Sequence, residues 1–442
     1  MCLKPVTLRE ALSFWLKLGF ISFGGPTGQI AILHQEVVEK RHWISERRFL
    51  HALNYCMVLP GPEAQQLVTY VGWLMHRNLG GILAGSLFVL PSLFILIALS
   101  WVYVRFGQVP IIAAIFFGIK PAVTAIVIQA VQRIGSRALK HQALWYIAAA
   151  SFIAIFIFNL AFPIIIILAA LIGMWGGKRY PAVFAITSGA HGNNTAVINI
   201  PALIDDDTPI PEHARFNLKK SIMHTVIGLS LWIAPMVLLI ALFDWKSLYP
   251  QLAWFFTKAA LLTFGGAYAV LPYVYQGAVD QYHWLTAGQM IDGLALGETT
   301  PGPLIMIVAF VGFLAGYAQH LFGSMHAFWA GAFAASVVTW FTFLPSFLFI
   351  LLGAPLIEST HGKLSFTAPL TAITAAVVGV IANLGLFFAY HVFFPHGLAG
   401  AISWLSILIF IGSAVALLRY KKGVMPVLGC AALAGLASLL LP

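Results

Sequence analysis

Long apolar runs follow one another along almost the whole chain, and few charged residues interrupt them. Of the 442 residues, 60% are hydrophobic and 9% are charged, whereas a soluble domain has about 25% charged residues. A helix needs about 20 apolar residues to cross a bilayer. Runs such as FVLPSLFILIALSWVYV (88–104) have nearly this length and lack the alternation of a membrane β-strand. The sequence therefore predicts an all-α polytopic membrane protein whose apolar surface contacts the lipid bilayer.

An internal repeat narrows the architecture further. When 241 is added to each position, the first half aligns with the second. The FGG motif at 23–25 falls on the FGG motif at 264–266, and the PGP motif at 60–62 falls on that at 301–303. Over 15–62 against 256–303 no gap is needed, and 12 of 48 pairs are identical. The sequence thus predicts a first membrane repeat at 1–175, a polar linker at 176–221 and a second membrane repeat at 222–442.

The charges of the matching loops predict the orientation of each repeat in the membrane. The loop EKRHWISERR (39–48) has four cations, and its counterpart DQYHWLTAGQ (280–289) has none. Since cation-rich loops stay in the cytoplasm, the two repeats are expected to have opposite orientations, with broken or re-entrant helices. Two parallel repeats whose loop charges have drifted are the alternative.

The repeated glycines and prolines are expected to interrupt helices inside the membrane. An interrupted backbone is tolerated there only if it is buried in protein or lines a wet cavity. Each new helix start presents unpaired N–H groups and about half a positive charge, which suits an anion. The candidate helix-break residues are Pro60, Pro62, Pro301 and Pro303. The candidate substrate-binding residues of these breaks are Gly24, Gly25, Pro26, Gly61, Gly265, Gly266 and Gly302.

Polar side chains beside the breaks complete the candidate site. Lys17 and Lys258 are paired by the repeat and precede each FGG motif, although snorkelling to the interface is an alternative. Gln65, Thr299 and Thr300 can donate hydrogen bonds to an oxyanion, or they can pack helices together.

Two acids border the PGP motifs without being repeat equivalents. Glu63 and Glu298 are candidates for proton coupling, since burial favours the neutral form of a carboxyl group. Glu63 is also a candidate substrate-binding residue. The alternative is that each acid only complements the dipole of a helix start.

Other functions lack a motif. There is no GxxxxGK[ST] for ATP and no HExxH, and the three cysteines show no CxxC spacing. We therefore expect no enzyme activity, metal site or cofactor. The net charge of +10 is interpreted as a mark of cytoplasmic loops, and no nucleic-acid partner is expected.

At this point a family resemblance becomes visible. The stretch FGGPTGQIAILHQEVVEKRHWISERRFLHALNYCMVLPGPEAQQLVTYVGWLMHRNLGG (23–81) resembles the first domain of the chromate ion transporter family. The second FGG motif and GETTPGPLIMIVAFVGFLAG (297–316) resemble that family's second domain, so that the likeness covers nearly the whole chain in its long two-domain form. Many members carry His where this chain has Gln29, so no role of that His is carried over. Gln29 is retained as a candidate substrate contact.

The resemblance implies a function that the residues alone leave open. It implies a secondary active transporter that exports chromate, or its structural mimic sulfate, across the bacterial plasma membrane and confers chromate resistance. An uptake carrier or channel for sulfate or another oxyanion is the alternative. The oligomeric state stays open, a homodimer included.

Overall fold

A computed structural model describes residues 6–23, 25–184, 202–205, 208, 212–360, 367–397 and 400–440. Gly24 and much of the expected linker lie outside these residues. The described part is helical apart from short connections and one isolated bridge between Ile44 and Ile204. The prediction of an all-α polytopic membrane protein is confirmed.

The helices fall into two series. The first series contains α1 (Leu8–Ile21), α2 (Gly25–His34), the π-helix η1 (Gln35–Lys40), α3 (Glu46–Cys56), α4 (Glu63–Phe106), α5 (Pro110–Ala138), α6 (Gln142–Phe156), α7 (Phe162–Arg179) and α8 (Pro181–Phe184). The second contains η2 (Glu212–Ala214), α9 (Leu218–Phe243), α10 (Leu248–Leu262), α11 (Ala267–Tyr275), the π-helix η3 (Gln276–Gln281), α12 (Ala287–Thr299), η4 (Leu304–Met306), α13 (Ile307–Gln319), η5 (Ser324–His326), α14 (Ala327–Thr360), α15 (Thr367–Phe393), α16 (Trp404–Ala414), η6 (Val415–Arg419), α17 (Val424–Ala437) and η7 (Ser438–Leu440).

The internal repeat is visible in the backbone itself. The π-helices at 35–40 and 276–281 are separated by the same 241 residues as the sequence motifs. His42 and His283, also 241 apart, both have φ 51°, which is uncommon for a residue other than glycine. Ser45 caps α3 and Thr286 caps α12, each accepting a hydrogen bond from the backbone three residues on. The duplicated sequence therefore folds into a duplicated structure.

Several predicted apolar segments divide into shorter elements. Among the described residues, six helices are long and apolar enough to span a membrane, and shorter apolar helices accompany them. The apolar stretch at 10–38 divides into α1, α2 and η1, because the backbone leaves the helix before Gly25. The long α4 has a kink at His76 and Arg77, where φ and ψ are not helical. The peripheral helix α9 belongs to the second series only, and most of its apolar side chains are exposed, as lipid-facing residues would be.

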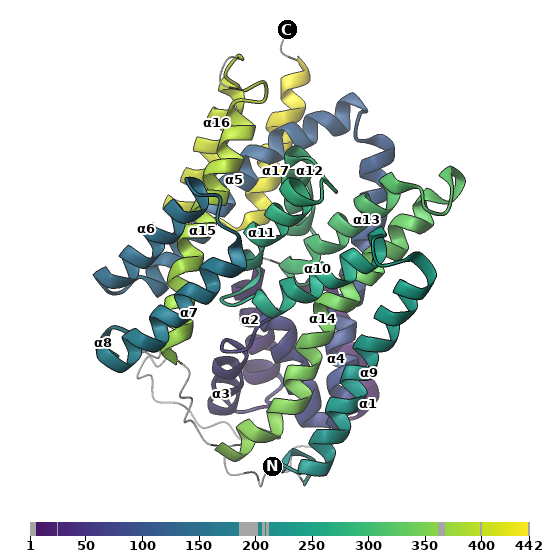
Figure 1. Ribbon diagram of the computed structural model, residues 1–442, viewed down its shortest axis with the longest axis vertical. Helices are drawn as coiled ribbons and strands as arrows, with labels where there is room; N and C mark the ends of the chain where they lie inside the picture. Colours follow the sequence, from purple (N-terminus) through teal and green to yellow (C-terminus); the bar gives the residue numbers. More distant parts are fainter. Residues whose placement is uncertain are drawn as a thin grey trace.

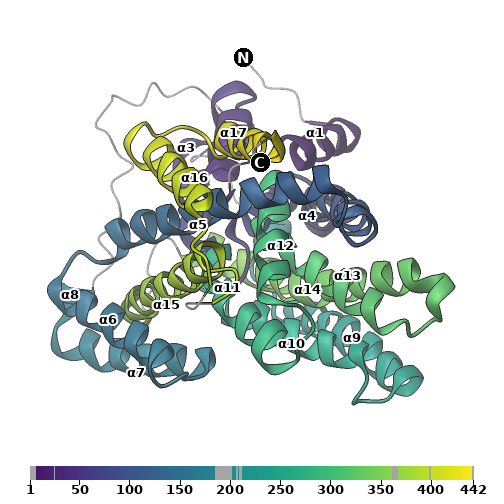
Figure 2. The same cartoon turned by 90° about the horizontal axis from the view of Figure 1, so that it is seen from above.

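Helices of one series pack against helices of the other in a reciprocal way. α6 and α7 pack on α15, and their counterparts α16 and α17 pack on α5 (Figures 1 and 2). Glycines allow these backbones to approach closely. A Cβ at Gly435 of α17 would lie 2.1 Å from the carbonyl oxygen of Ala114 in α5, and one at Gly379 of α15 would lie 2.0 Å from that of Ala148 in α6. The two series therefore share one interior.

The two short hairpins that follow the FGG motifs lie on opposite sides of the middle of the molecule. Figure 1 shows α2 and α3 in the lower half and α11 and α12 in the upper half. This is the arrangement expected of repeats with opposite orientation.

Candidate functional site

Two reciprocal hydrogen bonds join the helix breaks of the two repeats. The Gly61 N–H donates to the Thr263 carbonyl at 2.8 Å, and the Gly302 N–H donates to the Ser22 carbonyl at 2.8 Å. Adding 241 to Gly61 and Ser22 gives Gly302 and Thr263, so each bond is the repeat image of the other. Such reciprocity is typical of two-fold symmetry. The PGP turn of each repeat therefore meets the residue before the FGG motif of the other, at a place called here the junction.

The PGP glycines at the junction are tightly packed. A Cβ on Gly61 would lie 2.3 Å from Ser346 Oγ, and one on Gly302 would lie 2.8 Å from Ser92 Cβ. Both glycines have a left-handed backbone, with φ of 122° and 100°. Since their N–H groups are already bonded, Gly61 and Gly302 hold the two repeats together, and a substrate finds no free backbone donor on either residue. The prolines beside them lie in the non-helical turns before α4 and η4, as predicted.

The FGG glycines have more space around them. A Cβ on Gly25 would meet no atom within 4 Å, and one on Gly266 would meet Glu63 Oε1 at 3.8 Å. A Cβ on Gly265 would meet only Thr374, at 3.7 Å. Gly266 caps α11, and Gly25 and Pro26 open α2. At each FGG motif, space beside a glycine therefore lies next to the start of a helix.

Both candidate acids lie at the junction. Glu63 is the first residue of α4, and its carboxylate faces Gly266. Glu298 is buried near the end of α12 and accepts a hydrogen bond from the hydroxyl group of Tyr268 in α11. The start of α11 therefore lies close to both carboxyl groups, although the acids are not repeat equivalents.

The remaining polar candidates are mostly occupied by bonds within the protein. Gln29 Nε2 donates to the Gly302 carbonyl, and Gln65 Nε2 donates to Thr69 Oγ1 at 3.0 Å. The hydroxyl groups of Thr299 and Thr300 donate to the Leu296 carbonyl at 3.0 and 2.6 Å. Gln29 therefore adds another bond between the repeats, and the two threonines close the end of α12.

The repeat-related lysines are not turned toward the junction. Lys17 is exposed on α1, within electrostatic range of the surface acid Glu36. Lys258 is half-buried, with Nζ 5.7 Å from the ring centroid of the exposed Trp254. This placement favours the snorkelling alternative for both lysines over contact with a substrate.

Sequence reasoning missed the cations that do lie at the junction. Arg133 and Arg137, on α5, are within electrostatic range of Glu63, and Arg133 is also within range of Glu298. The Arg133 guanidinium lies 5.8 Å from the ring centroid of Tyr268. In the sequence these arginines stand in the polar stretch QRIGSRALK (132–140), which is typical of a cytoplasmic loop. Their spacing of four residues, which continues a helical segment, was the signal that could have identified them.

Buried hydroxyl groups without a protein partner also surround the junction. Among the described residues these include Ser22 Oγ, Ser92 Oγ and Ser346 Oγ, and all three residues are almost fully buried. Ser92 and Ser346 belong to the similar stretches VLPS and FLPS, and each touches the PGP glycine of the other repeat. The junction is therefore a polar region in the interior of a largely apolar protein.

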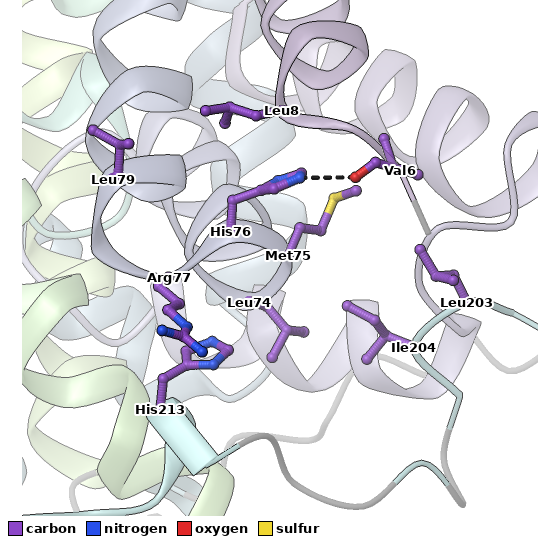
Figure 3. Close-up of a pocket in the computed structure, with 10 residues that line it drawn as sticks. All are labelled: Val6, Leu8, Leu74, Met75, His76, Arg77, Leu79, Leu203, Ile204 and His213. Atoms are coloured by element: carbon purple, nitrogen blue, oxygen red, sulfur yellow. Dashed lines mark hydrogen bonds between the residues drawn. The ribbon is translucent and has the colours of Figure 1, made fainter. Parts of the chain in front are cut away.

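A pocket of about 540 Å³ lies elsewhere, beside the kink of α4. Figure 3 shows His76 pointing toward the Val6 carbonyl, and Arg77 beside His213. Burial lowers the pKa of His213 below its ordinary value. None of the residues predicted to bind substrate lines this pocket.

Comparisons with known proteins identify relatives along most of the chain. A family model described as "Chromate transporter" matches residues 9–174 and 250–436, which leaves out α9. The "Chromate transport protein" of Cupriavidus metallidurans is 30% identical over 376 residues, covering 85% of this chain and 81% of the relative. That of Pseudomonas aeruginosa is 32% identical over 384 residues, covering 85% and 80%. The "Uncharacterized transporter YwrA" of Bacillus subtilis is 28% identical over 134 residues, covering 29% of this chain and 75% of the relative. No solved structure matches.

Proposed function

Because the chain belongs to the chromate transporter family, we propose that it exports chromate across the plasma membrane by secondary active transport and so confers chromate resistance. The observation that carries the mechanism is the junction, where broken helices of both repeats meet through reciprocal hydrogen bonds. Inverted repeats with broken helices near the membrane centre are the general plan of alternating-access carriers.

The chemistry of the junction supports an anionic substrate. The starts of α2 and α11 carry partial positive charge, and the FGG glycines leave room for a ligand to approach the backbone. Gly25, Pro26, Gly265 and Gly266 are retained as the proposed substrate contacts. Gly24, which precedes α2, lies outside the described residues and stays a prediction from the sequence.

Chromate and sulfate are both tetrahedral dianions, and hydrogen-bond donors alone distinguish them poorly. We therefore propose that sulfate competes with chromate for the same site.

We also propose the bacterial inner membrane as the location of the protein. A homodimer stays an open prediction.

The two acids at the junction are the proposed proton-coupling groups. Glu63 faces the FGG glycine of the second repeat, and Glu298 is bonded to Tyr268 two residues further on. Protonation of either carboxyl group removes a negative charge near the bound anion and so weakens the electrostatic repulsion of that anion. The proposal therefore links proton exchange with substrate occupancy through α11.

Accumulation by cells tests the direction of transport. Cells that produce the chain should accumulate less chromate than cells without it and should grow at higher chromate concentrations. Higher accumulation would contradict export and favour the alternative, an uptake carrier or channel. Equal accumulation and equal uptake by vesicles would contradict chromate transport altogether.

Inside-out membrane vesicles test the driving force and the two acids. Chromate uptake is measured with a pH gradient, a sulfate gradient or a membrane potential imposed in turn. We expect Glu63→Gln and Glu298→Gln to abolish the response to the pH gradient while chromate still binds. Glu10→Gln, at an exposed position on α1, is the matched control. A normal pH response in both junction variants would remove these acids from the mechanism.

A further inference from the structure

Arg133 is a cation at the junction without an acidic partner in contact. Among the described residues no carboxylate oxygen lies within 4.0 Å of its guanidinium, although seven such contacts involve other basic residues. Its side chain is half-buried near the end of α5. A half-buried arginine that forms no ion pair keeps its charge and its N–H donors available to another anion.

The ring of Tyr268 holds this guanidinium in place. The guanidinium carbon lies 5.8 Å from the ring centroid, within the range of a cation–π contact. The hydroxyl group of the same tyrosine is bonded to Glu298. The tyrosine stands in the first turn of α11, two residues after Gly266, where a Cβ would meet only Glu63 Oε1, at 3.8 Å. The arginine therefore lies near the start of α11.

Arginine also has the right chemistry for a tetrahedral oxyanion. Its planar fork offers two parallel N–H donors to two oxygens of one anion, which a lysine ammonium group cannot do. Of the lysines predicted from the sequence, Lys17 is exposed and Lys258 lies beside the ring of Trp254, so Arg133 is the better candidate for this charge at the junction.

We propose that Arg133 binds the transported oxyanion directly, beside the start of α11, and that Arg137 attracts the ion as it enters. This inference rests on the proposed function and names the residue that recognises the substrate. Arg137 lies one turn further along the same face of α5 and is exposed. Glu63 and Glu298 are both within electrostatic range of Arg133, so the bound anion, the arginine and the two acids interact electrostatically.

Uptake of radiolabelled chromate by proteoliposomes containing the full chain tests this role. We expect Arg133→Gln to raise KM for chromate at least tenfold, as the loss of a charge-assisted hydrogen bond would. Arg133→Lys should raise KM less, because it keeps the charge and loses the fork. Arg137→Gln should raise KM only at low ionic strength, where long-range attraction is not screened. Arg105→Gln, an exposed arginine at the end of α4, is the control.

Stabilisation by chromate separates recognition from folding. Chromate should raise the unfolding temperature of the detergent-solubilised wild type and of Arg133→Lys, but not that of Arg133→Gln. If Arg133→Gln binds and transports chromate with a KM within twofold of the wild type, the inference is overturned while the proposed function stands. If the wild type neither binds nor transports chromate or sulfate, the proposed function itself fails.

Discussion

At the scale of single residues, the junction depends on two positions where no side chain fits. Gly61 and Gly302 combine a left-handed backbone with contact against a serine of the other repeat. Gly25 also has a left-handed backbone, with φ 69°, but has open space around it. The structure thus separates glycines that hold the fold from glycines that leave room for a ligand.

Alanine substitutions test this separation. We expect Gly302→Ala to lower the free energy of unfolding by about 1–3 kcal/mol, since the new methyl group would be forced against Ser92. Gly412→Ala should be neutral or stabilising by up to about 1 kcal/mol, because Gly412 is helical and has nothing within 4 Å. Thermal unfolding in detergent measures both. Equal unfolding temperatures for the two variants would contradict the packing argument.

The residues of the candidate site could be predicted only in part. The glycines, the prolines and the two acids carry a signal because the motif repeats and because charges are rare in apolar segments. Arg133 and Arg137 carry no such signal, since a cationic stretch after an apolar run is typical of a loop. Lys17 is paired by the repeat and is exposed, because pairing by the repeat does not determine which side of α1 a residue faces.

At the scale of elements, each hairpin is attached to the other repeat by an ionic cluster. In α12, Asp292 pairs with Lys120 of α5 at 3.2 Å and accepts a hydrogen bond from Tyr103 of α4 at 2.8 Å. In α3, Arg48 lies 3.7 Å from Glu358 of α14, which also accepts a hydrogen bond from Tyr70. The two clusters attach α12 and α3 to long helices of the opposite series.

The first cluster predicts unequal effects of removing its two charges. Asp292 is 5% exposed, whereas Lys120 is 31% exposed. Lys120→Gln leaves a buried carboxylate unpaired and should lower the free energy of unfolding by about 3 kcal/mol or more. Asp292→Asn leaves a lysine that can reach water, and should cost about 1 kcal/mol or less.

The double variant provides the decisive comparison. Lys120→Gln with Asp292→Asn should recover most of the stability that Lys120→Gln loses, because no buried charge is then left alone. Thermal unfolding of the three variants measures this. A double variant as unstable as the sum of both single variants would contradict the ionic role.

Element boundaries were harder to predict than element type. The long apolar stretch at 10–38 divides beside the FGG motif into α1 and α2, where the glycines and proline predicted a helix break, but hydropathy alone gives neither boundary. The apolar stretches at 50–76 and 80–104 meet within α4 at His76 and Arg77, where φ and ψ are not helical, so the predicted break between them coincides with the observed kink. α7 continues to Arg179, past the expected end of the first repeat at 175.

At the scale of the whole molecule, the opposite orientation of the repeats has a direct test. Lys40 and Gln281 are repeat equivalents, are both exposed and end the two π-helices. In a chain whose native cysteines are replaced, Lys40→Cys should react with an impermeant maleimide only from the cytoplasmic side. Gln281→Cys should react only from the opposite side. Labelling of both from one side would contradict inversion and the alternating-access mechanism with it.

The duplication and the membrane class could be predicted from the sequence, because they rest on spacing and composition. The exchange of helices between the series could not, because hydropathy does not say which apolar faces meet. α6 and α7 belong to the first series, and they pack on α15 of the second.

That exchange imposes an order of assembly on a chain made from its N-terminus onward. When α5 enters the bilayer, the helices that will cover Gly118 have not been synthesised, since Ala431 and Gly435 stand near the end of the chain. The close backbone contacts between α5 and α17 can therefore form only after α17 has been synthesised, and until then lipid contacts this face of α5. In a nascent chain halted before its last two helices, α5 would be inserted without the helices that pack on it. Folding of the membrane domain would therefore require the complete chain.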